Sequence, residues 1–247
     1  KFVELCGISK AQSSADYAML EYCIREDLKT KAPRMMAILD PVKLVIDNYP
    51  EGQTEMLPVV NNPENEALGS REVPFGKELY IEREDFMEEP PKKYFRMFPG
   101  NEVRLMNAYF VKCTGCVKDE NGKVVEVHGT YDPESRGGNS PDGRKVKGTI
   151  HWVSAAESVK AQVRLYENII DEEKGVYNED GSLNLNPNSL TTLTECRLEP
   201  AFAKAQPYDR FQFVRQGFFC VDCKDTKPGE PVFNRIVSRK SSYVLPK

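Results

Sequence analysis

The chain has 247 residues, of which 40% are hydrophobic and 10% aromatic, so it can bury a substantial core and is too apolar to be disordered. Its 34 Lys and Arg against 38 Asp and Glu give a net charge of −4, which excludes a generally basic coat for non-specific nucleic-acid or DNA binding but not a local basic patch. No apolar run approaches the roughly 20 residues that cross a bilayer, and the first ten residues lack a signal-peptide layout. The seven cysteines are typical of reduced thiols, so we expect a soluble protein of a reducing compartment with no membrane partner.

The first 33 residues are predicted to be helical. Residues 1–6 are typical of the last turns of an amphipathic helix capped by Gly7, which suggests a piece of a longer protein. A second helix is expected to begin at a cap formed by Ser13 or Ser14 and to end before Pro33. Its apolar residues recur at three- and four-residue spacing, at Tyr17, Leu20, Ile24 and Leu28.

From residue 36 onward the apolar pattern has a period of two, which is typical of half-buried strands. We expect strands over residues 78–82, 144–153 and 160–166, and a hairpin in which Asp-Glu-Asn-Gly joins residues 111–117 to 124–127. In the second of these strands, the expected inward face is Val146, Gly148, Ile150 and Trp152. The expected outward face is Lys145, Lys147, Thr149 and His151.

Many short strands after one leading helix favour one or two antiparallel barrels or sandwiches. Residues 132–143, with three Gly and two Pro, and the Asn-rich residues 175–189 are expected to be surface excursions. A break between two β units is expected near residues 155–159, where barrels can still exchange strands.

Four cysteines offer a metal hypothesis. Cys113 and Cys116, with Cys220 and Cys223, have the Cys-x-x-Cys spacing of a tetrahedral zinc site. About a hundred residues separate the two pairs, and residues three apart point to opposite faces of a regular strand, so each pair would need a special turn. The alternative is a set of free thiols.

Signals for catalysis are weak. The two histidines, His128 and His151, lie in no nucleophile or metal motif and are interpreted as ordinary strand residues. The acidic run at residues 82–89 is typical of a solvated face, and the glycine pair at residues 137–138 lies in a turn rather than before a helix.

Arginine and glutamine residues beside aromatic residues are the better lead. They are Arg34, Arg96, Arg104, Gln212 and Arg215. A guanidinium fork can bind two acceptors of guanine at once, and a glutamine amide offers a donor and an acceptor to an unpaired base. The alternative is that each is a surface or ion-pair residue.

Several strings resemble the C-terminal part of the glutaminyl-tRNA synthetase family. They are CIREDLKTKAPRMMAILDPVKLVIDNYPEG at 23–52, GSREVPFGKELYIEREDF at 69–86, DGRKVKGTIHWVSA at 142–155, FQFVRQGFF at 211–219 and PVFNR at 231–235. The resemblance covers nearly the whole chain, in the family's order. It implies a mainly β fold in which a helical subdomain (residues 1–33) precedes two antiparallel β-barrels of the anticodon-binding type also found in a ribosomal protein. The barrels would span residues 34–158 and 159–247, and late strands could return to the first barrel.

The resemblance also implies roles for single residues. Arg34 and Gln212 match positions that hold the middle anticodon base, a uracil; Arg96 and Arg215 match those for the third base, a guanine; and Arg104 matches a contact to the first base, C or U. Phe95 and Met106 stand where family members can carry basic residues, so readout of the first base departs from the pattern. Because Gln212 and Arg215 are three residues apart, we expect a bulge, a strong twist or a strand end between them.

The chain is therefore expected to be the tRNA-Gln recognition module of a class I ligase. No string matches the HIGH and KMSKS signatures of the class I core, so ATP and magnesium are expected to act in that missing core, and this chain is expected to be inactive, monomeric and cytoplasmic. Candidates for phosphate contacts are Lys29, Lys31, Lys92, Lys93, Lys145 and Arg235.

Two alternatives stay open, a sister glutamyl-tRNA synthetase and a zinc-stabilised interaction scaffold. If an acidic chain binds RNA, its cations must be segregated. We therefore expect the four anticodon arginines to line one concavity, with the acidic run at residues 82–89 elsewhere.

Overall fold

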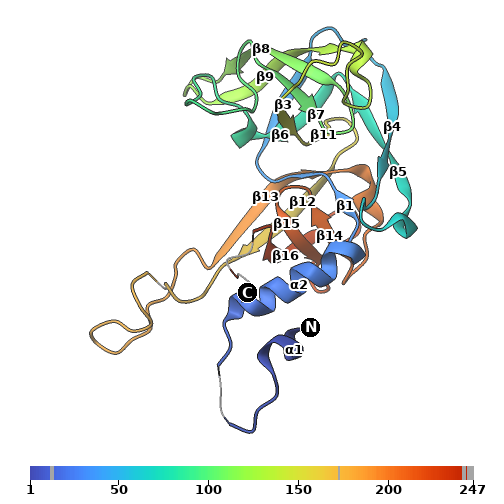
Figure 1. Ribbon diagram of the computed structural model, residues 1–247. Helices are drawn as coiled ribbons and strands as arrows, with labels where there is room; N and C mark the ends of the chain where they lie inside the picture. The colour runs from blue at the N-terminus through green and yellow to red at the C-terminus, as the bar shows by residue number, and fades with distance from the viewer. Residues whose placement is uncertain (12–13, 172, 241–242, 244–247) are drawn as a thin grey trace.

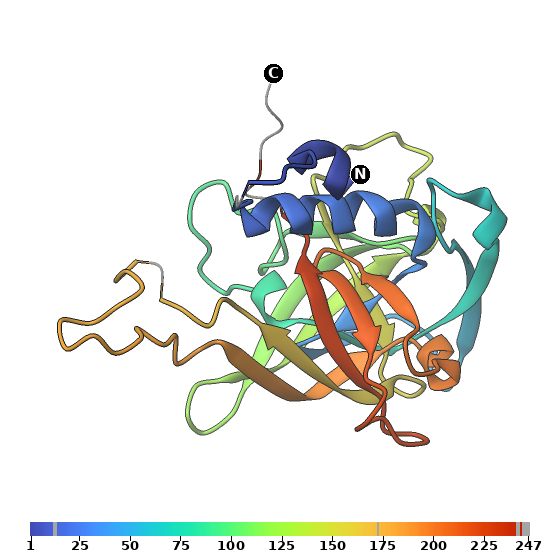
Figure 2. The same cartoon turned by 90° about the horizontal axis from the view of Figure 1, so that it is seen from below.

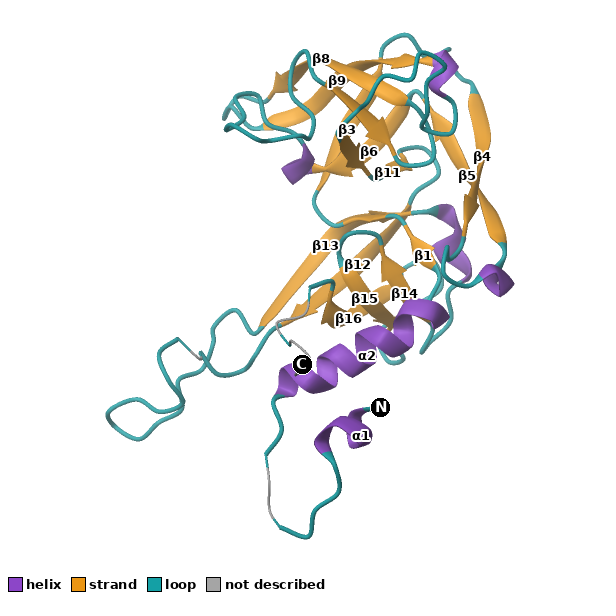
Figure 3. Ribbon diagram, in the orientation of Figure 1, coloured by secondary structure: helices purple, strands orange, loops and turns teal. Residues whose placement is uncertain are grey.

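The computed structural model describes residues 1–11, 14–171, 173–240 and 243. Two strongly curved seven-stranded sheets, each nearly closed into a barrel, lie one above the other, and the N-terminal helices lie beneath the second sheet (Figure 1). Strands far outnumber helices, as Figure 3 shows by colour. The predicted mainly β fold with a short helical start is confirmed.

The first sheet has the strand order β10-β7-β8-β9-β3-β6-β11. Its strands are β3 (Pro41–Ile46), β6 (Glu78–Glu82), β7 (Glu102–Leu105), β8 (Phe110–Lys118), β9 (Val124–Asp132), β10 (Gly148–Ile150) and β11 (Trp152–Ser154). The predicted hairpin is β8–β9, with the Asp119 N–H donating to the Lys123 carbonyl across the turn. Short 3-10 turns follow β6 and β9, η2 (Arg83–Asp85) and η3 (Pro133–Ser135).

The second sheet has the order β1-β14-β15-β16-β12-β13-β2. Its strands are β1 (Arg34–Met35), β2 (Ala37–Ile38), β12 (Val159–Tyr166), β13 (Leu190–Leu198), β14 (Arg210–Phe213), β15 (Gly217–Val221) and β16 (Val232–Ser238), with the 3-10 turn η4 (Pro200–Lys204) after β13. Thus residues 34–38 pair with the second sheet although they precede every strand of the first. The division into units at residues 34 and 159 stays a prediction.

A two-stranded ribbon, which the sequence pattern did not reveal, runs alongside both sheets (Figure 1). It consists of β4 (Thr54–Val60) and β5 (Ser70–Gly76), and its tip contains η1 (Glu66–Leu68). Phe75 of the ribbon packs into the hydrophobic core of the first sheet. At the tip, Asn62 Nδ2 donates to the Lys29 and Ala32 carbonyls, each at 2.9 Å, and so satisfies acceptors that the end of the preceding helix leaves free.

The N-terminal helices are α1 (Phe2–Cys6) and α2 (Tyr17–Lys31). Gly7 ends α1 with a φ of 74°, as expected. The cap of α2 is Asp16, whose carboxylate accepts from the Ala18 N–H at 2.9 Å, so the prediction of Ser14 was wrong, and Ser13 lies outside the described residues. Figure 2 shows α2 lying across the second sheet, where Leu28 packs with Phe218. Among the described residues no helix is long and apolar enough to span a membrane.

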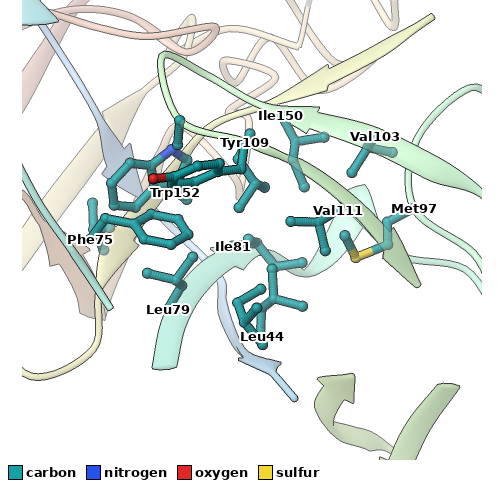
Figure 4. Packing of buried hydrophobic residues seen from close by; sticks show 14 of the residues in the cluster. Leu44, Phe75, Leu79, Ile81, Met97, Val103, Tyr109, Val111, Ile150 and Trp152 are labelled. Atoms are coloured by element: carbon teal, nitrogen blue, oxygen red, sulfur yellow. The ribbon is translucent and has the colours of Figure 1, made fainter. Parts of the chain in front are cut away.

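The core of the first sheet gathers around Trp152, which meets Phe75 edge to face at a centroid distance of 5.1 Å (Figure 4). Its Nε1 donates to the Met106 carbonyl at 3.0 Å, so the ring is buried without an unpaired donor. Ile150 and Trp152 point inward as predicted, and both are fully buried.

One predicted strand is not continuous. Residues 144–147 are not in a strand, and β10 and β11 pair at opposite edges of the first sheet, with β7 and β6 respectively. The chain therefore closes the barrel at His151, which lies between them. The prediction that His151 faces outward was wrong, because the side chain is 0% exposed. The period-two pattern identified the buried face that carries Ile150 and Trp152. It could not reveal that the second sheet covers the opposite face at His151.

The ribbon is held to the second sheet by a buried ion pair. Arg71 donates from Nε and Nη2 to the two carboxylate oxygens of Glu199, each at 2.6 Å, and from Nη1 to Asn61 Oδ1. Glu199 Oε1 also accepts from the Met36 N–H. The two charged side chains are 11% and 1% exposed, so removing either leaves a buried charge.

We predict that Arg71→Met lowers the free energy of unfolding by about 3–5 kcal/mol, because the Glu199 carboxylate then lacks its counter-charge. Adding Glu199→Gln removes that stranded charge and should restore part of the loss. Lys160→Met breaks the exposed pair with Glu195 and should cost less than about 1 kcal/mol. Urea unfolding of the four proteins measures this, and equal losses in Arg71→Met and Lys160→Met would contradict it.

Candidate nucleic-acid interface

Arg34 and Gln212 lie side by side. β1 pairs with β14 in parallel, and Arg34 is the register partner of Gln212. The pairing is anchored on both sides, because the Gln212 N–H donates to the Pro33 carbonyl at 2.9 Å and the Val214 N–H to the Met35 carbonyl at 3.0 Å. Two residues 178 positions apart in sequence thus present their side chains at one place on the sheet.

This pair contains an unused donor and an unused acceptor. Arg34 Nε and Gln212 Oε1 are both buried and have no hydrogen-bond partner among the described residues. The outer end of Arg34 is held by Nη2 donating to Glu64, and hydrogen bonds from Arg34 and Lys29 hold the pKa of the Glu64 carboxyl below its usual range. An unpaired buried polar atom costs about 1–3 kcal/mol, so the arrangement favours a ligand that supplies one acceptor and one donor.

Arg96 and Arg215 meet at one buried carboxylate. Arg215 donates from Nη1 and Nη2 to the two oxygens of Asp85, at 2.6 and 2.7 Å. Arg96 Nη1 lies 3.2 Å from Asp85 Oδ1 and 3.0 Å from Glu84 Oε1. Asp85 is 0% exposed and lies in η2, directly after β6 of the first sheet, whereas Arg215 lies in the turn between β14 and β15 of the second sheet. The ion pair therefore joins the two sheets and brings two cations together.

Arg215 does not lie on a strand. β14 ends at Phe213, and Arg215 lies in the turn to β15 with a φ of 67°. This left-handed conformation is uncommon for a residue with a Cβ and marks a position held by its surroundings. Of the bulge, twist or strand end expected between Gln212 and Arg215, the structure has the strand end, so the alternation of faces along a regular strand does not apply to this pair.

Behind Arg215 lies a second buried acid. Glu82 is 2% exposed, and its two oxygens accept from the Leu39 N–H at 2.8 Å and the Asp40 N–H at 3.0 Å. Gln216 Nε2 donates to the same carboxylate at 2.9 Å. Burial raises the pKa of Glu82, but interactions with His151 and the two backbone N–H groups outweigh it, and the net pKa lies below the usual range.

The prediction for the acidic residues 82–89 was wrong. We expected residues 82–89 to form a solvated face away from the arginines, but Glu82 and Asp85 are buried. Glu84 and Asp85 contact Arg96 and Arg215 directly. Strand alternation places Glu82 on the face opposite Ile81, and the sequence gives no signal that the second sheet covers this face.

Arg104 forms a separate group. Its guanidinium lies over the Phe110 ring at 5.3 Å, beside Arg144 at 5.0 Å from the same ring, and its buried Nε has no hydrogen-bond partner in the described part of the chain. No hydrogen bond or ring contact among the described residues links Arg104 to the other four predicted anticodon residues. Phe95 is exposed, and Lys147 lies 5.1 Å from its ring centroid.

The phosphate candidates differ in their contacts. Lys29 and Lys31 pair with Glu64 and Asp27, at 3.1 and 2.5 Å, and Arg235 pairs with Glu167. The other three, Lys92, Lys93 and Lys145, are exposed and make no ion pair within the described residues. His128 is an ordinary half-buried strand residue, and hydrogen bonds to Asp47 and Glu126 raise its pKa.

Comparison with known proteins gives a consistent family. Two family models, each described as the anticodon-binding domain of class I tRNA synthetases (E and Q), match residues 32–132 and 149–222. The curated glutamine–tRNA ligases of Clostridium kluyveri and Clostridium perfringens are 53% and 54% identical, over 99% of this chain and 44% of their own length. That of Bradyrhizobium diazoefficiens is 51% identical, over 98% of this chain and 43% of its own. The chain thus spans less than half the length of these relatives.

The cysteines do not come together as a zinc site. Cys113 and Cys116 lie on β8 of the first sheet, with a bulge between Cys113 and Gly115, whereas Cys220 lies on β15 of the second sheet and Cys223 follows it. Within the described ranges, no three His, Cys, Asp or Glu side chains gather as metal ligands do. The geometry gives the zinc scaffold no support.

We predict a graded reactivity of the thiols at pH 8. Cys6 and Cys223 should react first with a thiol reagent, because they are the exposed cysteines, whereas Cys116 and Cys220 are only partly exposed. Burial raises the pKa of Cys113 to about 11 and that of Cys196 to about 12, so both remain protonated at this pH and should react only on unfolding. Mass spectrometry of the timed reaction tests this, and early modification of either buried thiol would contradict it.

Proposed function

The chain belongs to the anticodon-binding domains of the class I tRNA synthetases for glutamate and glutamine, and from this we propose that it recognises the anticodon of tRNA-Gln, read as C or U, then U, then G. The observation that carries the proposal is the neighbouring free donor and acceptor at Arg34 and Gln212. A further observation is the pair of arginines gathered on Asp85.

The middle base is assigned to Arg34 and Gln212. Uracil presents a ring N–H beside carbonyl oxygens, so Gln212 Oε1 can accept from the N–H while Arg34 Nε donates to an oxygen. Cytosine instead presents an unprotonated ring nitrogen and an amino group, which face the same two atoms with the wrong polarity. The pair therefore discriminates between the pyrimidines.

The third base is assigned to Arg96 and Arg215. Guanine presents two acceptors on one edge, which match a guanidinium fork. The same base separates the two branches of the family. The third anticodon base pairs with the first codon letter, and it is guanine in the glutamine anticodons but cytosine in the glutamate anticodons. Recognition of guanine favours the glutaminyl branch over the alternative glutamyl one.

The first base is assigned to Arg104. Its buried Nε is free, and Phe110 supports the guanidinium from beneath. Phe95 and Met106 supply no charge there, which fits tolerance of C or U. Lys92, Lys93 and Lys145 are proposed to contact phosphates together with Lys29, Lys31 and Arg235, and such contacts position RNA without reading it.

The whole ligase is proposed to attach glutamine to tRNA in the cytoplasm with ATP and magnesium. We propose that this chemistry takes place in a part of the ligase outside these 247 residues, which contain no string matching the HIGH and KMSKS signatures. We propose that the chain itself is a monomer that binds tRNA without charging it.

We predict that changing the middle base from U to C weakens tRNA binding by about one to two decades, the equivalent of about 1–3 kcal/mol for an unsatisfied buried group. Gln212→Ala should reduce this ratio while lowering affinity for the correct tRNA only modestly. As a matched control, Lys145→Ala should weaken both tRNAs equally. Dissociation constants from a filter or fluorescence assay decide it. An unchanged ratio in Gln212→Ala would refute the assignment.

We also predict that the purified chain binds tRNA-Gln but shows neither ATP–pyrophosphate exchange nor tRNA charging, even at high protein concentration, because it contains no ATP-binding motif. The control is a full-length glutamine–tRNA ligase in the same assay. Charging that survives rigorous repurification would show that the proposed division of labour is wrong.

A further inference from the structure

His151 lies where the two sheets meet. It occupies the single position between β10 and β11 at which the first barrel closes, and its side chain is 0% exposed. Its Nε2 is 3.0 Å from the Ala37 carbonyl oxygen on β2, and its Nδ1 is 3.3 Å from Arg215 Nη1. Glu82 Oε1 is farther away, 3.6 Å from Nε2. The imidazole thus bridges a strand of the second sheet and the arginine assigned to the third base.

The two partners fix the tautomer. A carbonyl oxygen can only accept, so Nε2 carries the hydrogen and donates to Ala37. A guanidinium can only donate, so Nδ1 must be unprotonated to accept from Arg215. Neutral His151 satisfies both contacts with its two nitrogens, and no other standard side chain of similar size and shape offers a donor and an acceptor on opposite sides of a rigid ring.

The hydrogen bonds of Arg215 leave the donors on one edge of its guanidinium unused. A guanidinium has five N–H groups. Nη1 faces Asp85 and His151, and Nη2 gives one hydrogen to Asp85 and lies 3.8 Å from Glu84 Oε1, beyond hydrogen-bond distance. The Nε–H and the second Nη2–H make no hydrogen bond within the described residues, and they lie together on one edge of the planar group. That edge is the fork that matches the two acceptors of guanine.

We propose that His151 is a positioning residue for third-base recognition. A carboxylate fork alone allows the arginine to tilt and slide on Asp85, whereas a third partner on Nη1 fixes the plane and thereby the direction of the free edge. His151 is itself anchored to Ala37 on β2, three residues after Arg34 on β1, so the arginine assigned to the third base is linked to the short segment of chain that also carries a residue assigned to the middle base. The inference rests on the proposed function.

The test is a double-mutant cycle with wild type, His151→Phe, Arg215→Met and the double variant, and tRNAs whose third anticodon base is G or A. Phe fills similar volume but neither accepts nor donates. We expect His151→Phe to reduce the G-to-A affinity ratio by about tenfold, and the double variant to match Arg215→Met, because both changes remove one interaction. The middle-base U-to-C ratio should change by less than about twofold.

If His151 has only a structural role, its substitution should lower the G-to-A and U-to-C affinity ratios together, or should lower only the fraction of protein that binds tRNA. Circular dichroism and urea unfolding check the fold, and His151→Leu replaces the Phe variant in the same cycle if that variant does not fold. An unchanged G-to-A ratio, or additive effects of the two substitutions, overturns the inference while leaving the proposed function intact. Failure of the wild type to discriminate at either base overturns both.

Discussion

The rest of the interface depends on one interaction, the ion pairing of the buried Asp85 carboxylate with Arg96 and Arg215. A charge with no exposed surface requires counter-charges, and both arginines that can reach it, Arg96 and Arg215, are drawn to it. Since Arg215 comes from the second sheet, meeting this requirement also fixes how the two sheets face each other. The left-handed backbone of Arg215 is the local strain that this contact maintains.

A protein with a net negative charge can present a surface for RNA only if its acidic side chains do not block the donors of its basic side chains. Here the acids are not kept away from the arginines but form ion pairs with them. Glu64 holds the outer end of Arg34, and Asp85 holds Arg96 and Arg215. Carboxylates in these positions orient the guanidinium groups, so under the proposed function selectivity would arise from hydrogen-bond direction rather than from net charge.

The sequence predicted the mainly β fold, the hairpin β8–β9 and the inward faces of β6 and β11, because each depends on local alternation and turn chemistry. It also predicted a bulge, a strong twist or a strand end between Gln212 and Arg215, and the structure has the strand end. It could not reveal the burial of Glu82, Asp85 and His151, because each is covered by a segment remote in sequence. The sequence pattern did not reveal the ribbon β4–β5, because Pro58 and Pro74 interrupt the strand pattern. The core on which one face of the ribbon packs is also formed by other segments of the chain.

The pairing of β1 with β14 and of β2 with β13 has a consequence for the order of folding. The first sheet uses only residues 41–154 and can close as soon as that stretch has been synthesised, whereas residues 34–38 must wait for partners about 160 to 180 positions downstream. Until β14 leaves the ribosome, Arg34 can pair with Glu64 but lacks its register partner Gln212, so the proposed middle-base site is incomplete. We therefore expect a nascent chain to complete its first barrel well before the proposed anticodon site can form, so that binding of RNA at that site would report that synthesis of the second barrel is complete.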